Sequence, residues 1–172
     1  DAVHSVTSDT AEAGIVKQLR QGLENVSVRP IYLRQGRMDG VRVIDLTRIL
    51  GGPFGTQWLG DHGAEVIKIE PPGKGDAVRG WRAVEGDTSL WWYSLGRNKR
   101  SVTVNLASDE GRQVIRDLVA NADVLLENYK VGAMTRFGLG HEELLALNPG
   151  LVYCSISAFG QSGSRASEPG YD

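Results

Sequence analysis

The amino-acid sequence predicts an α/β fold with a mainly parallel, Rossmann-like sheet and flanking helices. Short β-branched runs alternate with helical patterns along most of the 172 residues, and this alternation is typical of βαβ units. The runs are rich in β-branched and other apolar residues, as expected of largely buried strands in a parallel sheet. We therefore expect right-handed crossovers between neighbouring strands.

The first 38 residues differ in composition from the rest, and we expect them to form an N-terminal extension or linker. Apolar residues at every fourth position predict a helix over residues 10–23, and Pro30 interrupts the apolar stretch that follows. The α/β pattern begins after this segment, so residues 39–172 are assigned to one domain.

The first βαβ unit is predicted over residues 41–69. Residues 41–46 are β-branched and form the first strand. Glycines follow as a tight turn, and Pro53 suits the first position of a helix over 54–62, because its missing N–H needs no partner there. Gly63 ends that helix, and residues 64–69 form the second strand.

The next predicted elements are a loop, a strand and an amphipathic helix. Prolines and glycines place residues 71–76 in a loop. The aromatic residues Trp91, Trp92 and Tyr93 follow, and we expect them to pack between domains or subunits. Alternation predicts a strand over 101–106, and apolar spacing predicts a helix over 108–120.

The last predicted elements bring the number of strands to five. Residues 122–126 form the fourth strand, and two short helices follow over 133–137 and 141–147. Pro149 ends the second helix, and residues 151–156 form the fifth strand.

The charge and composition exclude several function classes. With 19 Lys and Arg against 21 Asp and Glu, the net charge is −2, so a nucleic-acid partner is not expected. No apolar run has the length of a membrane span. Cys154 is the only cysteine and the three histidines lack ligand spacing, so no disulfide and no metal are expected.

The two ends of the chain carry expectations of their own. No basic segment followed by an apolar one opens the sequence, so we expect a cytoplasmic protein, with a mitochondrial location left open. The chain starts at Asp1 and stops at Asp172 directly after a stretch rich in glycine and serine. We therefore expect a piece of a longer protein.

The glycines after the first strand suggest a dinucleotide site, but their spacing argues against it. Gly51, Gly52 and Gly55 do not form G-x-G-x-x-G, and Pro53 removes an N–H that would bind a pyrophosphate. Glu70 would be the ribose-binding acid of such a site. A P-loop is also absent, because no G-K-[ST] sequence occurs.

Two other segments are candidates for an anion site. The basic residues of 98–101 form either a solvated turn or a phosphate contact. Residues 127–130 lie at the carboxyl end of a predicted strand, where α/β sheets bind ligands. The residues alone therefore predict an α/β domain with a site for an anionic ligand.

Read together, the motifs resemble class III CoA-transferases, the group of formyl-CoA transferase and carnitine CoA-transferase. The resemblance covers residues 39–172 and leaves the first 38 residues outside it. The segments that carry it are 40–48, 52–53, 59–70, 75–76, 79–81, 98–103, 122–129, 136–140, 148–149, 151–157, 159–163 and 169–172.

This resemblance implies the N-terminal portion of a large domain, truncated at its C-terminal end, in a two-domain chain that interlocks with a second copy. The implied reaction moves CoA between small carboxylic acids through an aspartyl acyl and an aspartyl-CoA intermediate. Acyl-CoA is then a substrate, and the partners are small acids and a second copy of the chain. The nucleophilic Asp lies beyond this sequence, so no catalytic residue is expected here.

The resemblance also places CoA contacts on particular residues. They are Leu50, Gly51, Val104, Asn105, Leu106, Ala107, Asn128, Tyr129, Lys130, Arg136 and Tyr171. Pro71 departs from the pattern, because some relatives carry a phosphate-binding Arg at this position. Three alternatives stay open here: Lys68 substitutes for this Arg, Lys74 substitutes for it, or the contact is missing.

Two alternatives remain open at this point. Acyl-CoA racemases of the same fold carry His where this chain has Tyr171, and a Tyr with an ordinary pKa near 10 is a poor base. The transferase is therefore favoured over the racemase. A non-catalytic CoA-binding or assembly module is the third possibility.

Overall fold

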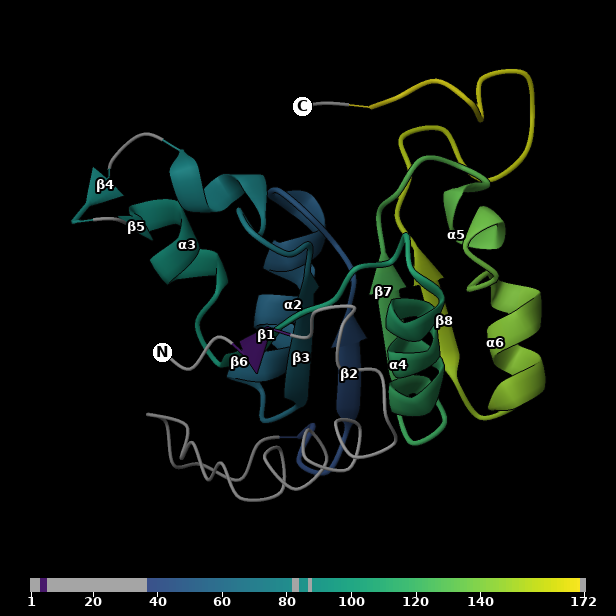
Figure 1. Ribbon diagram of the computed structural model, residues 1–172, viewed down its shortest axis with the longest axis horizontal. Helices are drawn as coiled ribbons and strands as arrows, with labels where there is room; N and C mark the ends of the chain where they lie inside the picture. The colour runs from purple at the N-terminus through teal and green to yellow at the C-terminus, as the bar shows by residue number, and fades with distance from the viewer. Residues whose placement is uncertain (1–3, 6–36, 82–83, 87, 171–172) are drawn as a thin grey trace.

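The structure is a computed structural model that describes residues 4–5, 37–81, 84–86 and 88–170 (Figure 1). The predicted helix over residues 10–23 lies outside the described residues, as does Tyr171. No helix in the described part of the chain has the length and apolar character of a membrane span.

A six-stranded parallel sheet forms the centre of the molecule, in the order β1-β6-β3-β2-β7-β8. Its strands are β1 (His4–Ser5), β2 (Arg42–Asp45), β3 (Glu65–Glu70), β6 (Lys99–Thr103), β7 (Val124–Glu127) and β8 (Val152–Ser155). The chain moves outward from β2 to β3 and β6, then returns to the other side of β2 as β7. This reversal is the topological switch point of a Rossmann-type sheet, where ligands bind beyond the carboxyl ends of the strands.

Helices cover both faces of the sheet (Figure 1). The larger core cluster joins Ile44, Ile67 and Leu125 of the strands to Ile115 of α4 and Leu144 of α6. The smaller cluster lies on the opposite face, under α2. The helices are α2 (Gly51–Asp61), α3 (Leu90–Leu95), α4 (Asp109–Val119), α5 (Ala133–Arg136) and α6 (His141–Leu147).

All five predicted strands and four predicted helices are present, and the parallel α/β fold is confirmed. Two boundaries differ in a way that matters for the site. Helix α2 begins at Gly51, so the glycines form its first turn and do not precede it. Strand β6 begins at Lys99, so the predicted basic turn is wrong for Lys99 and Arg100, which lie inside the strand.

The segment between β3 and β6 contains structure that the sequence did not predict. It holds the 3-10 helix η2 (Ala77–Gly80), an antiparallel hairpin of β4 (Val84–Glu85) and β5 (Thr88–Ser89), and α3. The hydroxyl of Ser89 caps α3 by accepting from the N–H of Trp91 at 3.1 Å. Trp91 and Tyr93 on α3 are 45% and 53% exposed.

Candidate functional site

The switch point lies between β2 and β7, and Asn128 joins the two loops that leave it. The N–H of Arg48 donates to Oδ1 of Asn128 at 2.8 Å, and Nδ2 of Asn128 donates to the carbonyl of Arg48 at 2.9 Å. Because both ends of the amide are occupied, the side chain of Asn128 holds the β2–α2 loop. The backbone of Arg48 is therefore fixed while its exposed side chain extends outward.

Three buried carboxylates, Asp45, Glu70 and Glu127, end the strands β2, β3 and β7. Each accepts a hydrogen bond from the loop that follows its own strand. The donors are the N–H groups of Thr47 at 3.0 Å, Asp76 at 2.8 Å and Tyr129 at 2.8 Å. The carboxyl edge of the sheet therefore carries loops that are tied to buried anions.

Asp45 is completely buried, and it is paired with Lys99, whose Nζ lies 3.1 Å from its Oδ2. The hydroxyl of Thr56 donates to the same oxygen at 2.6 Å. Burial raises the pKa of Asp45, but the charges of Lys68 and Lys99 and the hydroxyl hydrogen bonds outweigh it, so the pKa is lowered. Lys99 is committed to this pair, which rules it out as a phosphate contact at the edge.

Glu70 is occupied in the same way, by Arg79. Nε and Nη2 of Arg79 donate to Oε2 and Oε1 of Glu70, both at 2.7 Å, and Ser101 also donates to Oε1. Burial raises the pKa of Glu70, but hydrogen bonds from Arg79, Ser101 and the N–H of Asp76 outweigh burial, so the pKa lies below its ordinary value. The guanidinium also stacks 3.5 Å from the ring centre of Trp92. Both oxygens of Glu70 thus have internal donors, which agrees with the rejection of a dinucleotide site.

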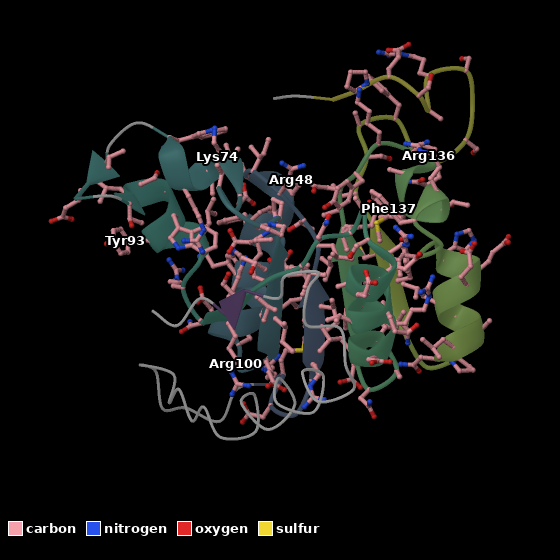
Figure 2. The ribbon with its side chains drawn as sticks, viewed as in Figure 1. Arg48, Lys74, Tyr93, Arg100, Arg136 and Phe137 are labelled. Carbon is pink, nitrogen blue, oxygen red and sulfur yellow. The ribbon has the colours of Figure 1, made fainter. Side chains whose placement is uncertain are left out.

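Four exposed cations surround the carboxyl edge: Arg48, Lys74, Lys130 and Arg136. Within the described residues, none of their side chains makes a hydrogen bond or an ion pair. Figure 2 shows Arg48, Lys74 and Arg136 at this edge, with Arg100 at the opposite end of the sheet. Cations without carboxylate partners are suited to bind an anionic ligand such as a phosphate.

Most of the predicted contact residues meet at this edge. Leu50 and Gly51 lie at the start of α2, and residues 128–130 follow β7. Arg136 ends α5, the next helix after β7. Tyr129 packs edge-on against Phe137, with ring centres 6.4 Å apart, and burial raises the pKa of its hydroxyl.

The segment 104–107 follows β6, two strands away from β2. Val104 is buried in the core, so it can offer a ligand its backbone but not its side chain. Arg112 fixes the end of the segment by donating to the carbonyls of Leu106 at 3.0 Å and Ala107 at 2.9 Å. Asn105 is exposed beside them.

Of the two lysines expected to replace the missing Arg at position 71, Lys68 is excluded. Its Nζ lies 3.2 Å from Asp76 and both side chains are 1% exposed, so it cannot reach a ligand. Lys74 is exposed and stays a candidate. The sequence pattern does not distinguish Lys68 from Lys74, because both lie near the carboxyl end of β3.

Arg48 and Asp76 are functional candidates that the motif reasoning missed. Arg48 directly follows the first predicted strand, which is the position where a parallel sheet presents ligand contacts. Its position directly after a strand could therefore have identified Arg48 from the sequence. Asp76 stands in one of the segments that carry the family resemblance, but the segment gives it no role, because its partners Ile49 and Lys68 become visible only in three dimensions.

Comparison with known proteins finds CoA-transferases both among family models and among individual relatives. Residues 38–172 match CoA-transferase family III. An acyl-CoA transferase from Fusarium pseudograminearum is 43% identical over 162 residues, which are 89% of this chain and 36% of that protein. A succinyl-CoA–D-citramalate CoA-transferase from Chloroflexus aurantiacus is 48% identical over 136 residues, or 78% of this chain and 34% of that one.

A solved structure agrees with these matches. The crystal structure of a CaiB/BaiF family protein from Brucella suis has a TM-score of 0.76 at 44% identity, over 81% of this chain and 38% of that one. The chain spans a little more than a third of the length of these relatives.

Proposed function

This chain belongs to CoA-transferase family III, and we propose that it forms the CoA-binding part of an enzyme that transfers CoA between carboxylic acids. The family membership confirms the resemblance drawn from the motifs. The observation that carries the proposal is a set of exposed cations at the switch point of a parallel sheet, whose side chains have no hydrogen-bond or ion-pair partner in the described part of the chain. CoA supplies the matching chemistry, because it carries a pyrophosphate and a further phosphate.

In this proposal, Arg136, Lys130 and Arg48 bind phosphate oxygens, and Lys74 replaces the cation that Pro71 removes. The N-terminus of α2 at Leu50 and Gly51 adds partial positive charge beside them. Tyr129 gives the apolar part of CoA a surface to pack on. Backbone groups and one exposed amide come from Val104, Asn105, Leu106 and Ala107, and Asn128 holds the loop. Tyr171 lies outside the described residues, and only the family resemblance assigns it a contact with CoA.

The proposed chemistry uses an aspartate outside this chain. Its carboxylate attacks the donor thioester carbonyl and expels CoA thiolate, which leaves a mixed anhydride on the enzyme. The thiolate then attacks the aspartyl carbonyl, releases the donor acid and forms an aspartyl-CoA thioester. The acceptor acid repeats these steps in reverse. In these reaction steps, the described residues hold the departing CoA thiolate close to the aspartyl carbonyl, so that it can attack that carbonyl.

The proposed substrates are CoA thioesters and small carboxylic acids. Relatives are named for acids of this kind, as in succinyl-CoA:glutarate CoA-transferase from Homo sapiens. We also propose that the whole protein works as a cytoplasmic homodimer. A transferase is favoured over a racemase because Tyr171 is a poor base at neutral pH.

Calorimetry with CoA on the whole protein tests the binding proposal, with Arg136→Ala as the test variant and Arg100→Ala as the control. Both changes remove an arginine, and Arg100 lies at the amino end of β6, away from the candidate site (Figure 2). Losing a hydrogen bond to a charged group should cost Arg136→Ala about 1.5–3 kcal/mol of CoA binding, while Arg100→Ala stays near the wild type. Equal affinities in the two variants would remove Arg136 from the site.

An exchange assay separates the transferase from a binding module. The whole protein is incubated with an acyl-CoA and several short acids, and new CoA thioesters are detected by chromatography. CoA binding without any exchange would favour the module, and absence of CoA binding would contradict the proposal itself.

A further inference from the structure

The loop that joins β2 to α2 contains an unusual backbone conformation. Ile49 has a φ of 71°, in the left-handed region. A β-branched residue is rare there, because its Cβ crowds the neighbouring carbonyl oxygen. A residue in such a conformation persists only where the surrounding structure fixes it, and residues of this kind gather at functional sites.

Asp76 supplies the contact that holds Ile49. The N–H of Ile49 lies 3.2 Å from each carboxylate oxygen of Asp76, and it donates to both. Asp76 is in turn paired with Lys68, at 3.2 Å. The ammonium of Lys68 also donates to the carbonyl of Thr47. The ion pair therefore binds two peptide groups of the same loop.

The pair is itself held in place. The N–H of Asp76 donates to Glu70, and Arg79 donates to both carboxylate oxygens of Glu70. On the far side of the loop, Asn128 holds both peptide groups of Arg48. The β2–α2 loop is thus fixed from β3 and from β7 at the same time.

Filling space does not explain this pair. Lys68 heads the fully buried side chains of the described residues by volume, and apolar residues of similar size often serve stability as well as a buried ion pair does. Apolar side chains cannot hydrogen-bond, whereas this charged pair provides an acceptor for the N–H of Ile49 and a donor for the carbonyl of Thr47.

We infer that Lys68 and Asp76 are positioning residues that hold Ile49 in its left-handed conformation and so present Arg48 and Leu50 to the ligand. The inference rests on the proposed CoA site and extends it to two buried residues that do not reach the ligand. Their effect passes through the backbone of the loop.

The test uses Asp76→Asn in the whole protein, with Glu65→Gln as the matched control. Asp76→Asn keeps the shape of the side chain and removes its charge. Glu65→Gln neutralises a carboxylate that pairs with Arg42 and Arg100 at the opposite end of β3. In Asp76→Asn we expect the KM for acyl-CoA to rise about tenfold with kcat little changed, as for a loss of uniform binding. Glu65→Gln should leave KM near the wild-type value.

A second substitution gives a readout that a merely structural role would not produce. Glycine adopts a positive φ without a Cβ penalty. Adding Ile49→Gly to Asp76→Asn should therefore recover part of the lost affinity for acyl-CoA. An unchanged KM in folded Asp76→Asn, or a double variant that binds no better than Asp76→Asn, overturns the inference. If Asp76→Asn does not fold, Lys68→Met combined with Asp76→Asn removes both charges and takes its place.

Hydrogen exchange distinguishes failure of this inference from failure of the proposed function. If the wild-type protein binds no CoA, the proposed function is wrong, but exchange at the amide of Ile49 still reports on the loop. That amide should exchange about tenfold faster in Asp76→Asn than in Glu65→Gln, because its acceptor is weakened. Equal exchange in the two variants refutes the inference.

Discussion

Replacement of Gly52 by Ala tests how tightly the β2–α2 loop is packed. A Cβ built on Gly52 would lie 2.3 Å from Cβ of Thr47 and 2.6 Å from its Cγ2. Thr47 is completely buried, and both its N–H and its hydroxyl donate to Asp45, so it has little freedom to move. Gly55 offers a matched control on the same helix, because a Cβ there has nothing within 4 Å.

The magnitudes follow from two opposing effects. Gly→Ala inside a helix gains about 1 kcal/mol of folding free energy, and Gly55→Ala should show that gain. Overpacking costs about 1–3 kcal/mol, and the contact at Gly52 is short enough to place it near the upper end. Gly52→Ala should therefore lose about 2 kcal/mol net, since the propensity gain only partly offsets the clash.

Urea unfolding of the two variants measures this difference. At an m-value of about 2 kcal/mol/M, the midpoint should fall by about 1 M for Gly52→Ala and rise by about 0.5 M for Gly55→Ala. CoA affinity should drop in Gly52→Ala alone, because Thr47 adjoins Arg48 in the loop. If Gly52→Ala stabilises the protein as Gly55→Ala does, the loop yields to the added methyl group and the reasoning fails.

Two further predictions concern acid sensitivity and the aromatic helix. The pKa of Glu70 is held below its ordinary value of 4.5, so its contribution to stability is complete above that pH and is lost as the pH falls toward the lower folded-state pKa. Urea midpoints should therefore fall less steeply with acidification in Glu70→Gln than in the wild type, and parallel curves would contradict this. Trp91→Leu should lower the stability of the whole protein more than it changes the choice of acceptor acid, because exposed Trp91 is proposed to pack between domains or subunits. A stable variant with a changed ratio of kcat/KM between two acceptors would reverse that assignment.

Local patterns predicted the five strands β2, β3, β6, β7 and β8, because each of these segments contains a short β-branched or apolar run between clear breaks. The two-residue strand β1 (His4–Ser5) was not predicted, because it is short and polar. The helix predicted over 108–120 from its apolar spacing is α4, and the structure shows Ser108 as its cap, with the hydroxyl accepting from the N–H of Gly111 at 3.1 Å. Helix α3 was missed although Ser89 caps it in the same way. Its sequence is short and aromatic, so it shows no clear helical period that separates it from a loop.

The candidate site was predictable in position but not in its supporting contacts. Strand ends near Gly51 and Asn128 indicated the carboxyl edge, since parallel strands gather ligands there. The pairing of Lys99 with Asp45 spans 54 residues and depends on the order of the strands. A basic dipeptide such as Lys99-Arg100 is typical of a surface turn, and only the register of β6 against β3 shows that it lies within the sheet.

The ion pairs that β3 makes at the two ends of the sheet differ in their exposure to solvent, and this difference argues for a functional role at the carboxyl end. At the amino end, Glu65 is 32% exposed, and its pairs with Arg42 and Arg100 are partly open to solvent. At the carboxyl end, Lys68 and Asp76 are almost fully buried, although a buried ion pair is weak evidence for stability. Stability alone would be served as well by apolar side chains. The buried charges are therefore best explained by what they hold, which is the loop that presents Arg48 beside the switch point.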